Sequence, residues 1–287
     1  MSVEEALEKY GPSEITPDDI LTVDDPHFTS ENVALVTGAG NGIGYATSLC
    51  LAGNGLTVVG TDMDEEGLAE LEARAAELDL PGAVATVTGN LTDDEDIERI
   101  VAEASEHGQL RYLANIAGLQ TIAPIKEFPM EKYDLMQDVM LRAPLALTKE
   151  CWPHFEAGGG GAVGNMCSVH GHIVTKEKVA YNTVKFGLRG QTQSIAAEGE
   201  GDIRGFSVST AYVKTPLVAK QLPDSADSRG LTVDEVVNDV MLGPTRVKEM
   251  MEPYEVGNLF VWGFSKHAKH LNGGDITHEG GMSLTYE

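Results

Sequence analysis

The residues of this chain that could do chemistry together are a tyrosine, a lysine and a serine. Tyr181 and Lys185 are four residues apart, so they share one face if the segment is helical. An ammonium group close to a phenol favours the phenolate and should lower the pKa of Tyr181. Ser168, thirteen residues upstream, adds a hydroxyl that could hold an alcohol or carbonyl oxygen. Together these residue types indicate proton transfer to and from an alcohol.

A glycine-rich turn far upstream could bind the nucleotide that carries hydride. The segment from Thr37 to Gly44 reads TGAGNGIG; it follows an apolar run and precedes a helical pattern. Glycines in such a turn let backbone amides approach a pyrophosphate, which rests on the N-terminus of the helix. An ordinary strand-to-helix turn is the alternative, but the strand before the turn and the helix after it favour a dinucleotide site.

Asp62 predicts which dinucleotide binds. It ends the next apolar run, near the offset of about 20 residues at which an acid accepts hydrogen bonds from the adenosine ribose hydroxyls. A 2′-phosphate would be repelled by this carboxylate, and Asn41 and Met63 are uncharged. The sequence therefore predicts NAD rather than NADP as the cofactor. A strand-end acid in a plain turn is the alternative interpretation.

The chain alternates short apolar runs with helical stretches, which is typical of a parallel sheet with crossover helices. We expect one doubly wound, Rossmann-like α/β domain with a seven-stranded parallel sheet flanked by helices. The expected strands are Val33–Thr37, Leu56–Thr61, Ala83–Thr88, Tyr112–Asn115, Ala162–Met166, Gly205–Ser209 and a last one near Asp275–Thr277. The expected helices are Gly42–Ala52, Glu65–Leu78, Asp93–His107, Met130–Phe155 and Val179–Glu198.

Two segments stand outside this alternation. Residues 1–31 hold nine acids and one base, which indicates an acidic N-terminal arm before a domain of residues 32–287. Apolar residues such as Ile20 and Phe28 could pin the arm to the domain or to a neighbouring subunit, or the arm could be a flexible tail. Residues from about 216 to 253 form a helical but irregular stretch with prolines and glycines, which we interpret as a mobile lid.

Composition excludes several other classes. The net charge of −25 argues against nucleic-acid binding, and a pocket for an acid must then supply its own cations. No apolar run approaches the ~20 residues that a membrane helix needs, and the N-terminus lacks the pattern of a secretion signal. Cys50, Cys151 and Cys167 have unrelated spacings, which predicts reduced thiols in a cytoplasm rather than disulfides or a zinc site.

Four motifs, in their order and spacing, resemble the short-chain dehydrogenase/reductase family. They are TGAGNGIG, NIAG from Asn115 to Gly118, Ser168, and YNTVK from Tyr181 to Lys185. The resemblance runs from about Val33 to Met282. It implies an NAD-dependent oxidoreductase that interconverts a secondary alcohol and a ketone, with Ser168, Tyr181 and Lys185 as catalytic residues. It also implies a homodimer or homotetramer paired through the two long helices. The implied cofactor-binding residues are Gly38, Asn41, Gly42, Ile43, Gly44, Asp62, Asn90, Leu91, Asn115, Ala117, Gly118, Tyr181, Lys185, Val213 and Thr215.

Three segments resemble bacterial D-3-hydroxybutyrate dehydrogenases within this family. They read NIAGLQTIAPIKEFP, SVHG and TPLVAKQ. This resemblance implies that the substrate is D-3-hydroxybutyrate or a related 3-hydroxy acid, oxidised to acetoacetate or its counterpart. Ser168 would hold the reacting oxygen, and the substrate carboxylate would be held by Gln120, His170, Lys178 and Gln221. Each of these four alone would pass for a loop or surface residue, but together they favour a substrate site.

The chain departs from the family pattern at four places. Met140 replaces an Asn that holds a water linking the catalytic lysine to solvent. Thr210-Ala211 replaces a Pro-Gly pair beside the nicotinamide, and Asn90 replaces an Asp that contacts the adenine. Met282 replaces a Trp of the hydroxybutyrate enzymes, which would leave room for a larger substrate.

Two alternatives therefore stay open. The protein could act on a bulkier or cyclic alcohol, or it could be an NAD-binding protein with little catalysis and a regulatory or structural role. A His-x-His pair, His170 and His172, makes a metal site conceivable, but no third ligand cluster lies nearby in the sequence, so we expect no metal.

Overall fold

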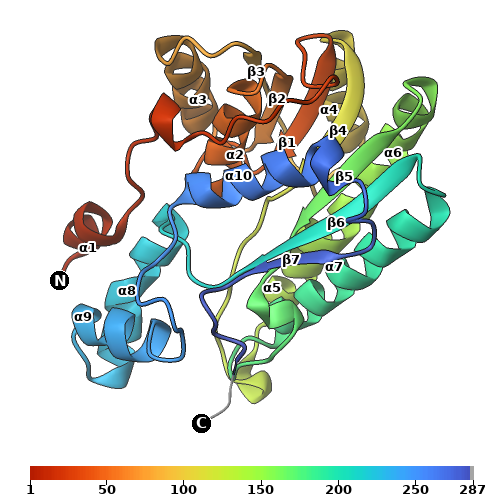
Figure 1. Ribbon diagram of the computed structural model, residues 1–287. Helices are drawn as coiled ribbons and strands as arrows, with labels where there is room; N and C mark the ends of the chain where they lie inside the picture. Colours follow the sequence, from red (N-terminus) through yellow and green to blue (C-terminus); the bar gives the residue numbers. More distant parts are fainter. Residues whose placement is uncertain (285–287) are drawn as a thin grey trace.

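A seven-stranded parallel sheet forms the centre of the computed structural model, which describes residues 1–284 (Figure 1). The strand order is β3-β2-β1-β4-β5-β6-β7, so the order reverses direction between β1 and β4. This arrangement confirms the predicted doubly wound fold class. The strands are β1 (Asn32–Thr37), β2 (Thr57–Asp62), β3 (Ala83–Thr88), β4 (Gln109–Asn115), β5 (Gly161–Met166), β6 (Ile203–Thr210) and β7 (Asp275–His278).

Helices cover both faces of the sheet (Figure 1). One face carries α2 (Gly42–Ala52), α3 (Glu65–Glu77) and α10 (Pro253–Phe264). The other face carries α4 (Asp94–Glu106), α6 (Ala143–Ala157) and α7 (Val179–Glu198). The single helix expected from Met130 to Phe155 is divided, because a π-helical turn at Asp138–Arg142 separates α5 (Met130–Gln137) from α6.

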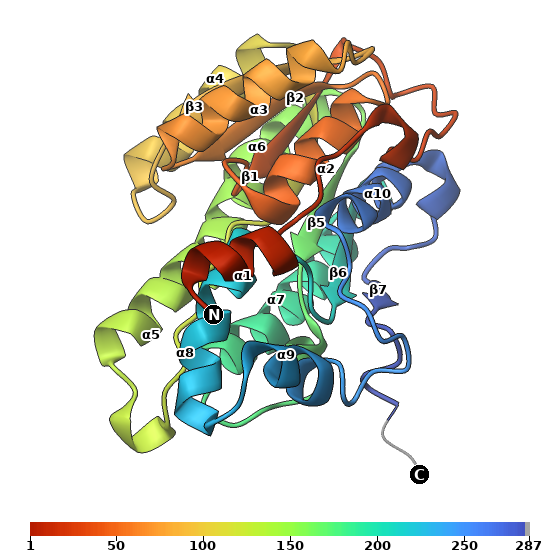
Figure 2. The ribbon, with the colours of Figure 1, turned by 90° about the vertical axis from the view of Figure 1, so that its left-hand side faces the viewer.

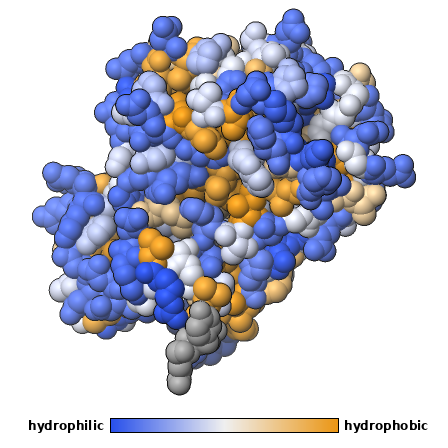
Figure 3. All heavy atoms as spheres, viewed as in Figure 1, coloured by the Kyte–Doolittle hydropathy of each residue, from blue (hydrophilic) through white to orange (hydrophobic). Residues whose placement is uncertain are grey.

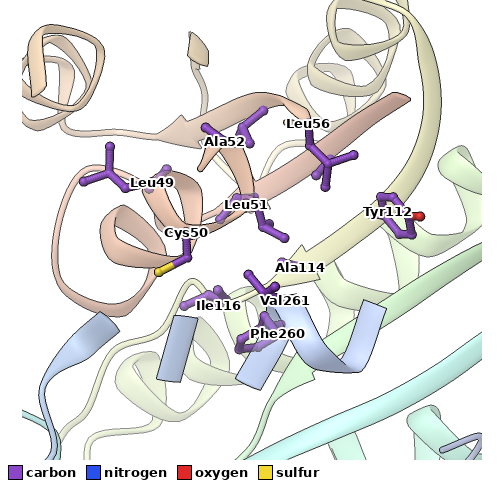
Figure 4. Packing of buried hydrophobic residues seen from close by; sticks show 14 of the residues in the cluster. Leu49, Cys50, Leu51, Ala52, Leu56, Tyr112, Ala114, Ile116, Phe260 and Val261 are labelled. Carbon is purple, nitrogen blue, oxygen red and sulfur yellow. The ribbon is translucent and has the colours of Figure 1, made fainter. Parts of the chain in front are cut away.

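The strands read as continuous apolar runs because both of their faces are buried. In β1, Ala34 and Val36 pack toward α2 and α10, whereas Val33 and Leu35 pack toward α4 and α6. Figure 4 shows side chains of α2 and α10 meeting over the sheet in the first of these two cores.

Helix α10 was not expected from the sequence, where Pro253 suggested the end of an irregular segment. Proline is well suited to the first turn of a helix, because the amide that it lacks has no partner there. Glu252 and Glu255 cap the helix, since the Glu252 amide donates to the Glu255 carboxylate at 2.7 Å. Gly257 permits the close approach to α2: a Cβ at this position would lie 2.9 Å from the sulfur of Cys50.

The N-terminal arm is folded along the domain. Its helix α1 (Val3–Tyr10) lies beside α8 (Pro216–Arg229), as Figures 1 and 2 both show. Ala6 is fully buried in this contact. The side chains of Lys9 and Tyr10 both donate to the carboxylate of Asp234, at 2.8 and 2.5 Å. Further along the arm, Phe28 is buried in the main core, as its apolar character suggested.

The segment from 216 to 253 has a small hydrophobic cluster of its own. It contains α8, the short helix α9 (Val233–Glu235) and a π-helical turn at Val236–Met241. Side chains of these elements, such as Leu222 and Val237, pack together with Met250 further along the segment, and Tyr10 of the arm packs against them. The arm therefore completes the core of the segment that we interpret as a lid.

The face in Figure 3 is mostly hydrophilic, with hydrophobic side chains gathered near its centre. Among the helices of residues 1–284, none is both long and apolar enough to cross a membrane.

Undocking the arm should expose the lid segment to proteases. Ala6→Glu places a bulky charge in a fully buried position, so we expect α1 to detach and trypsin to cleave faster after Lys220 and Arg229 in α8. Val3→Glu is the matched control, because Val3 is exposed on the same helix. Equal cleavage rates in the two variants, followed by mass spectrometry, would show that the arm does not support the lid segment.

Candidate active site

A cavity of about 730 Å³ opens at the carboxyl ends of the strands. Its walls include residues that directly follow β1, β4 and β5, such as Gly38, Ile116 and Cys167. Because strand order reverses between β1 and β4, the cavity lies at the point where doubly wound sheets bind ligands.

The glycine turn is shaped by two close backbone approaches. Gly38 has φ +69°, and a Cβ there would lie 2.8 Å from the Cα of Ala117. A Cβ at Gly44 would lie 2.1 Å from the carbonyl oxygen of Gly38. Any side chain at either position would push the turn away from α2 and from the loop after β4. The turn thus presents the N-terminus of α2 to the cavity, an arrangement that fits a pyrophosphate.

Asp62 has a fixed orientation at the end of β2. One carboxylate oxygen accepts from the Gly40 amide at 3.0 Å, and the other accepts from the amides of Met63 and Asp64 at 2.7 and 3.1 Å. Asn41 and Met63 line the same part of the cavity, and neither is charged. The surroundings of Asp62 therefore fit a ribose with free hydroxyls better than a phosphorylated one.

Tyr181 and Lys185 lie on successive turns of α7, as their spacing predicted. The Lys185 ammonium lies 5.3 Å from the centroid of the Tyr181 ring and donates to the Met166 carbonyl at 2.7 Å. Burial raises the pKa of Tyr181 to about 12, against a hydrogen bond with Ser168 that lowers it. Burial also lowers the pKa of Lys185 to about 8. The expectation that the lysine would lower the phenol pKa is thus wrong for the protein alone, because desolvation dominates.

His170 is buried beside the serine and the tyrosine. Its Nδ1 lies 3.2 Å from the Ser168 hydroxyl, and its Nε2 lies 3.0 Å from the Thr175 hydroxyl. The imidazole meets the Tyr181 ring edge to face, with centroids 5.5 Å apart. Burial, together with the charges of Lys178 and Lys185, lowers the pKa of His170 to about 4. The ring is therefore neutral at neutral pH.

The remaining residues implied for the substrate lie in the same cavity. Gln120, Lys178 and Gln221 all line it, although they come from three separate segments. Lys178 is partly buried, and this burial lowers the pKa of its ammonium. Met140 also lines the cavity from the π-helical turn, with an almost fully buried side chain. Met282 is buried and does not line the cavity.

Nearly all residues implied by the sequence meet in this cavity. Asn115 does not line it; its side chain is buried and donates to Asn165 at 2.9 Å. The implied residues that do line it are Gly38, Asn41, Gly42, Ile43, Gly44, Asp62, Asn90, Leu91, Ala117, Gly118, Gln120, Ser168, His170, Lys178, Tyr181, Lys185, Val213, Thr215 and Gln221.

Sequence reasoning missed three residues that matter to the site. Tyr212 and Lys220 line the cavity, and Thr175 holds the second nitrogen of His170. Tyr212 could have been found because it lies just after β6, and residues just after β1 to β5 also line the cavity. No sequence signal pointed to Thr175.

The second histidine of the His-x-His pair belongs to another contact. His172 Nε2 lies 2.8 Å from a carboxylate oxygen of Asp275 in β7. Within residues 1–284, no group of three or more His, Cys, Asp or Glu side chains is placed to hold a metal ion.

Comparison with known proteins identifies the family. The sequence profile of the short chain dehydrogenase family matches residues 32–226, more than half of the chain. The chain is 31% identical to the D-beta-hydroxybutyrate dehydrogenase of Rhizobium meliloti, covering 87% of this chain and 98% of that protein. It is 30% identical to the D-threitol dehydrogenase of Mycolicibacterium smegmatis, covering 92% and 97%. The structure of levodione reductase superposes with a TM-score of 0.82 at 25% identity, covering 90% of this chain and all of that one. The chain belongs to the short-chain dehydrogenase family of oxidoreductases.

The buried neutral His170 should make the protein sensitive to acid. A histidine whose folded-state pKa is near 4 binds its proton more readily in the unfolded chain, so stability is lost as pH falls from about 6.5 toward 4. Between about pH 7 and pH 5 this loss amounts to ~2 kcal/mol of unfolding free energy. His170→Gln should remove most of that loss in urea titrations, whereas His278→Gln, at an exposed position, should keep it. The same pH dependence in both variants would contradict the assignment.

Proposed function

We propose that this protein oxidises D-3-hydroxybutyrate, or a closely related 3-hydroxy acid, to the 3-keto acid with NAD, and catalyses the reverse reduction. The observation that carries the proposal is the composition of one cavity. The cavity contains the hydroxyl of Ser168, the phenol of Tyr181 and the ammonium of Lys185. It also contains the side chains of Gln120, Lys178 and Gln221. Such residues suit an alcohol and a carboxylate held a fixed distance apart.

The charges in the cavity support an acidic substrate. The basic side chains that line it are Lys178, Lys185 and Lys220, beside the neutral His170. Asp62, at the end of β2, is the one acid among the described residues of its walls. The whole chain has 45 acids against 20 bases, so this bias runs against the composition. A local excess of cations in a strongly negative protein favours an anionic ligand.

Each catalytic side chain has a distinct task. Tyr181 takes the alcohol proton on oxidation and returns it on reduction. Ser168 donates a hydrogen bond to the reacting oxygen. Lys185 holds positive charge near the phenol, which stabilises the phenolate during turnover. NAD supplies the hydride acceptor, and the glycine turn and Asp62 would hold it.

The choice of NAD over NADP is supported by the surroundings of Asp62. Its carboxylate is fixed by three backbone amides, and no cation of the described chain lines that end of the cavity. A 2′-phosphate would meet an uncompensated negative charge there.

Two alternatives remain for comparison. The size of the cavity and the likeness to D-threitol dehydrogenase and levodione reductase favour a bulkier or cyclic alcohol as the second candidate. A non-catalytic NAD-binding role is favoured only by the departures at Met140 and Thr210-Ala211, and the intact set of Ser168, Tyr181 and Lys185 argues against it.

The assembly and location that fit this function are part of the proposal. Leu145 on α6 and Phe186 on α7 are exposed apolar side chains, which suits pairing of these helices in a homodimer or homotetramer. The three cysteines are free and buried, which suits a reducing cytoplasm.

The first test is NADH formation at about pH 8 with D- and L-3-hydroxybutyrate in parallel. We expect turnover of the D-isomer. Tyr181→Phe should reduce turnover by a factor of about 10² or more while NAD binding, measured by fluorescence, stays nearly intact. If the wild type binds NAD but oxidises neither isomer, the hydroxy-acid proposal fails, and cyclohexanol tests the second candidate.

The role of Lys178 has its own test. Lys178→Met should raise the KM for D-3-hydroxybutyrate about 10- to 100-fold, since a hydrogen bond to a charged group is lost. Lys176→Met is the matched control, because Lys176 is exposed and outside the cavity. An unchanged KM in Lys178→Met would remove this residue from the substrate site.

Asp62 should set the cofactor preference. In the wild type we expect NAD to bind well and NADP poorly. Asp62→Ser should weaken NAD binding about 10- to 100-fold and strengthen NADP binding, as the charge that contacts the ribose is removed. Binding measured by fluorescence checks both changes, and an unaltered preference would place the ribose elsewhere.

A further inference from the structure

A hydrogen-bonded chain of side chains leads from Tyr181 to the protein surface. Ser168 lies next to Tyr181, whose pKa it lowers through a hydrogen bond. The Ser168 hydroxyl contacts His170 Nδ1 at 3.2 Å, and His170 Nε2 contacts the Thr175 hydroxyl at 3.0 Å. Tyr181, Ser168 and His170 line the cavity, whereas Thr175 lies outside it and is exposed to solvent.

Every hydrogen bond of this chain can donate in the same direction, from Tyr181 toward the surface. Once Tyr181 has taken the alcohol proton, its phenol can donate to Ser168. Ser168 then turns from the reacting oxygen to donate to Nδ1, and a proton on Nε2 is donated to Thr175. The His170 amide also donates to the Ser168 hydroxyl at 3.2 Å, so that oxygen is left with its own proton to pass toward the ring. Thr175 can then donate to water.

The described side chains around Lys185 give its proton no polar path to the surface. The Lys185 ammonium donates to the Met166 carbonyl, and the described chain offers it no other hydrogen-bond acceptor. Met140, which also lines the cavity, presents an apolar side chain that is 1% exposed. A thioether cannot pass a proton or anchor a water chain. Among the described side chains, the polar route from Tyr181 to solvent therefore runs through His170.

We propose that His170 and Thr175 carry the proton of the Tyr181 phenol to and from solvent. The proposal rests on Tyr181 being the residue that takes the alcohol proton. On oxidation the phenol proton moves to Ser168, the serine proton moves to Nδ1, the Nε2 proton moves to Thr175, and the threonine proton moves to water. The phenolate is thereby regenerated, and no atom besides one proton leaves the site. The imidazole ends with its proton on Nδ1. A flip of the ring resets it before the next oxidation, and reduction of the ketone runs the same transfers in reverse.

This assignment gives His170 a different task from holding the substrate carboxylate. Both ring nitrogens already have hydroxyl partners, and the neutral ring has no charge to offer an anion. A neutral imidazole instead accepts a proton on one nitrogen while it releases one from the other. Gln120, Lys178 and Gln221 then remain as the carboxylate site.

Thr175→Val tests the route without touching the cavity. The substitution keeps the shape of an exposed side chain and removes the hydroxyl at the outer end of the hydrogen-bonded chain. With D-3-hydroxybutyrate, we expect kcat for oxidation to fall about 10-fold and KM to stay unchanged. The solvent isotope effect in D₂O should grow, and the isotope effect of deuterium on the carbinol carbon should shrink, because proton exit becomes limiting. Thr175→Ser should restore both.

Two results would distinguish proton transfer through His170 and Thr175 from carboxylate binding by His170. An unchanged kcat and unchanged isotope effects in Thr175→Val would overturn the route. A raised KM with an unchanged kcat in His170→Gln would return His170 to the carboxylate site and would also overturn it. Should D-3-hydroxybutyrate not be oxidised by the wild type, the hydroxy-acid proposal alone fails, and the same series is run with cyclohexanol.

A measurement without turnover tests the arrangement directly. In ¹⁵N spectra of the full-length protein, His170 should be neutral at about pH 6 with its proton on Nε2, the tautomer that proton exit requires. Thr175→Val should shift the Nε2 resonance, and Thr175→Ser should restore it. A proton on Nδ1, or no response of Nε2 to Thr175→Val, would overturn the route even if neither alcohol is oxidised.

Discussion

The hydrogen bond from the Lys185 ammonium to the Met166 carbonyl ties α7 to the end of β5, and the geometry of the site depends on it. It holds a buried cation one helical turn from Tyr181 and beside Ser168, which follows the same strand. Desolvation is the largest influence on both pKa values: it raises the pKa of the Tyr181 phenol and lowers the pKa of the Lys185 ammonium. At neutral pH the Tyr181 phenol therefore keeps its proton, whereas the Lys185 ammonium is still mostly charged.

Burial also explains how the protein divides its charge. The surface carries the acids, while the cavity gathers lysines that the packing of α7 and α8 brings to one place. Lys178 and Lys220 come from different segments, and within residues 1–284 neither is paired with an acid of the walls. The anionic substrate that we propose would supply the missing counter-charge. The −25 charge of the chain as a whole would repel such a substrate at long range, and these cations would oppose that repulsion inside the cavity.

Much of the fold and of the site could be predicted from the sequence because its signals are local. The apolar runs fixed the strands, and the spacing of Tyr181 and Lys185 placed both on one face of α7. What could not be predicted depends on contacts between distant segments. Helix α10 begins at a proline that reads as a break, and Thr175 acquires its role only because the loop after β5 folds back on His170. The direction of the Tyr181 pKa shift likewise depends on burial, which no spacing reveals.

The docked arm has a consequence for the order in which the chain folds. The family profile begins at residue 32, so the arm lies outside it. Tyr10 leaves the ribosome before its partner Asp234, which follows 224 residues later. Until then α1, too short to be a stable helix alone, has nothing to fold against. Docking of the arm must therefore be one of the last steps of folding, after most of the sheet can already have formed.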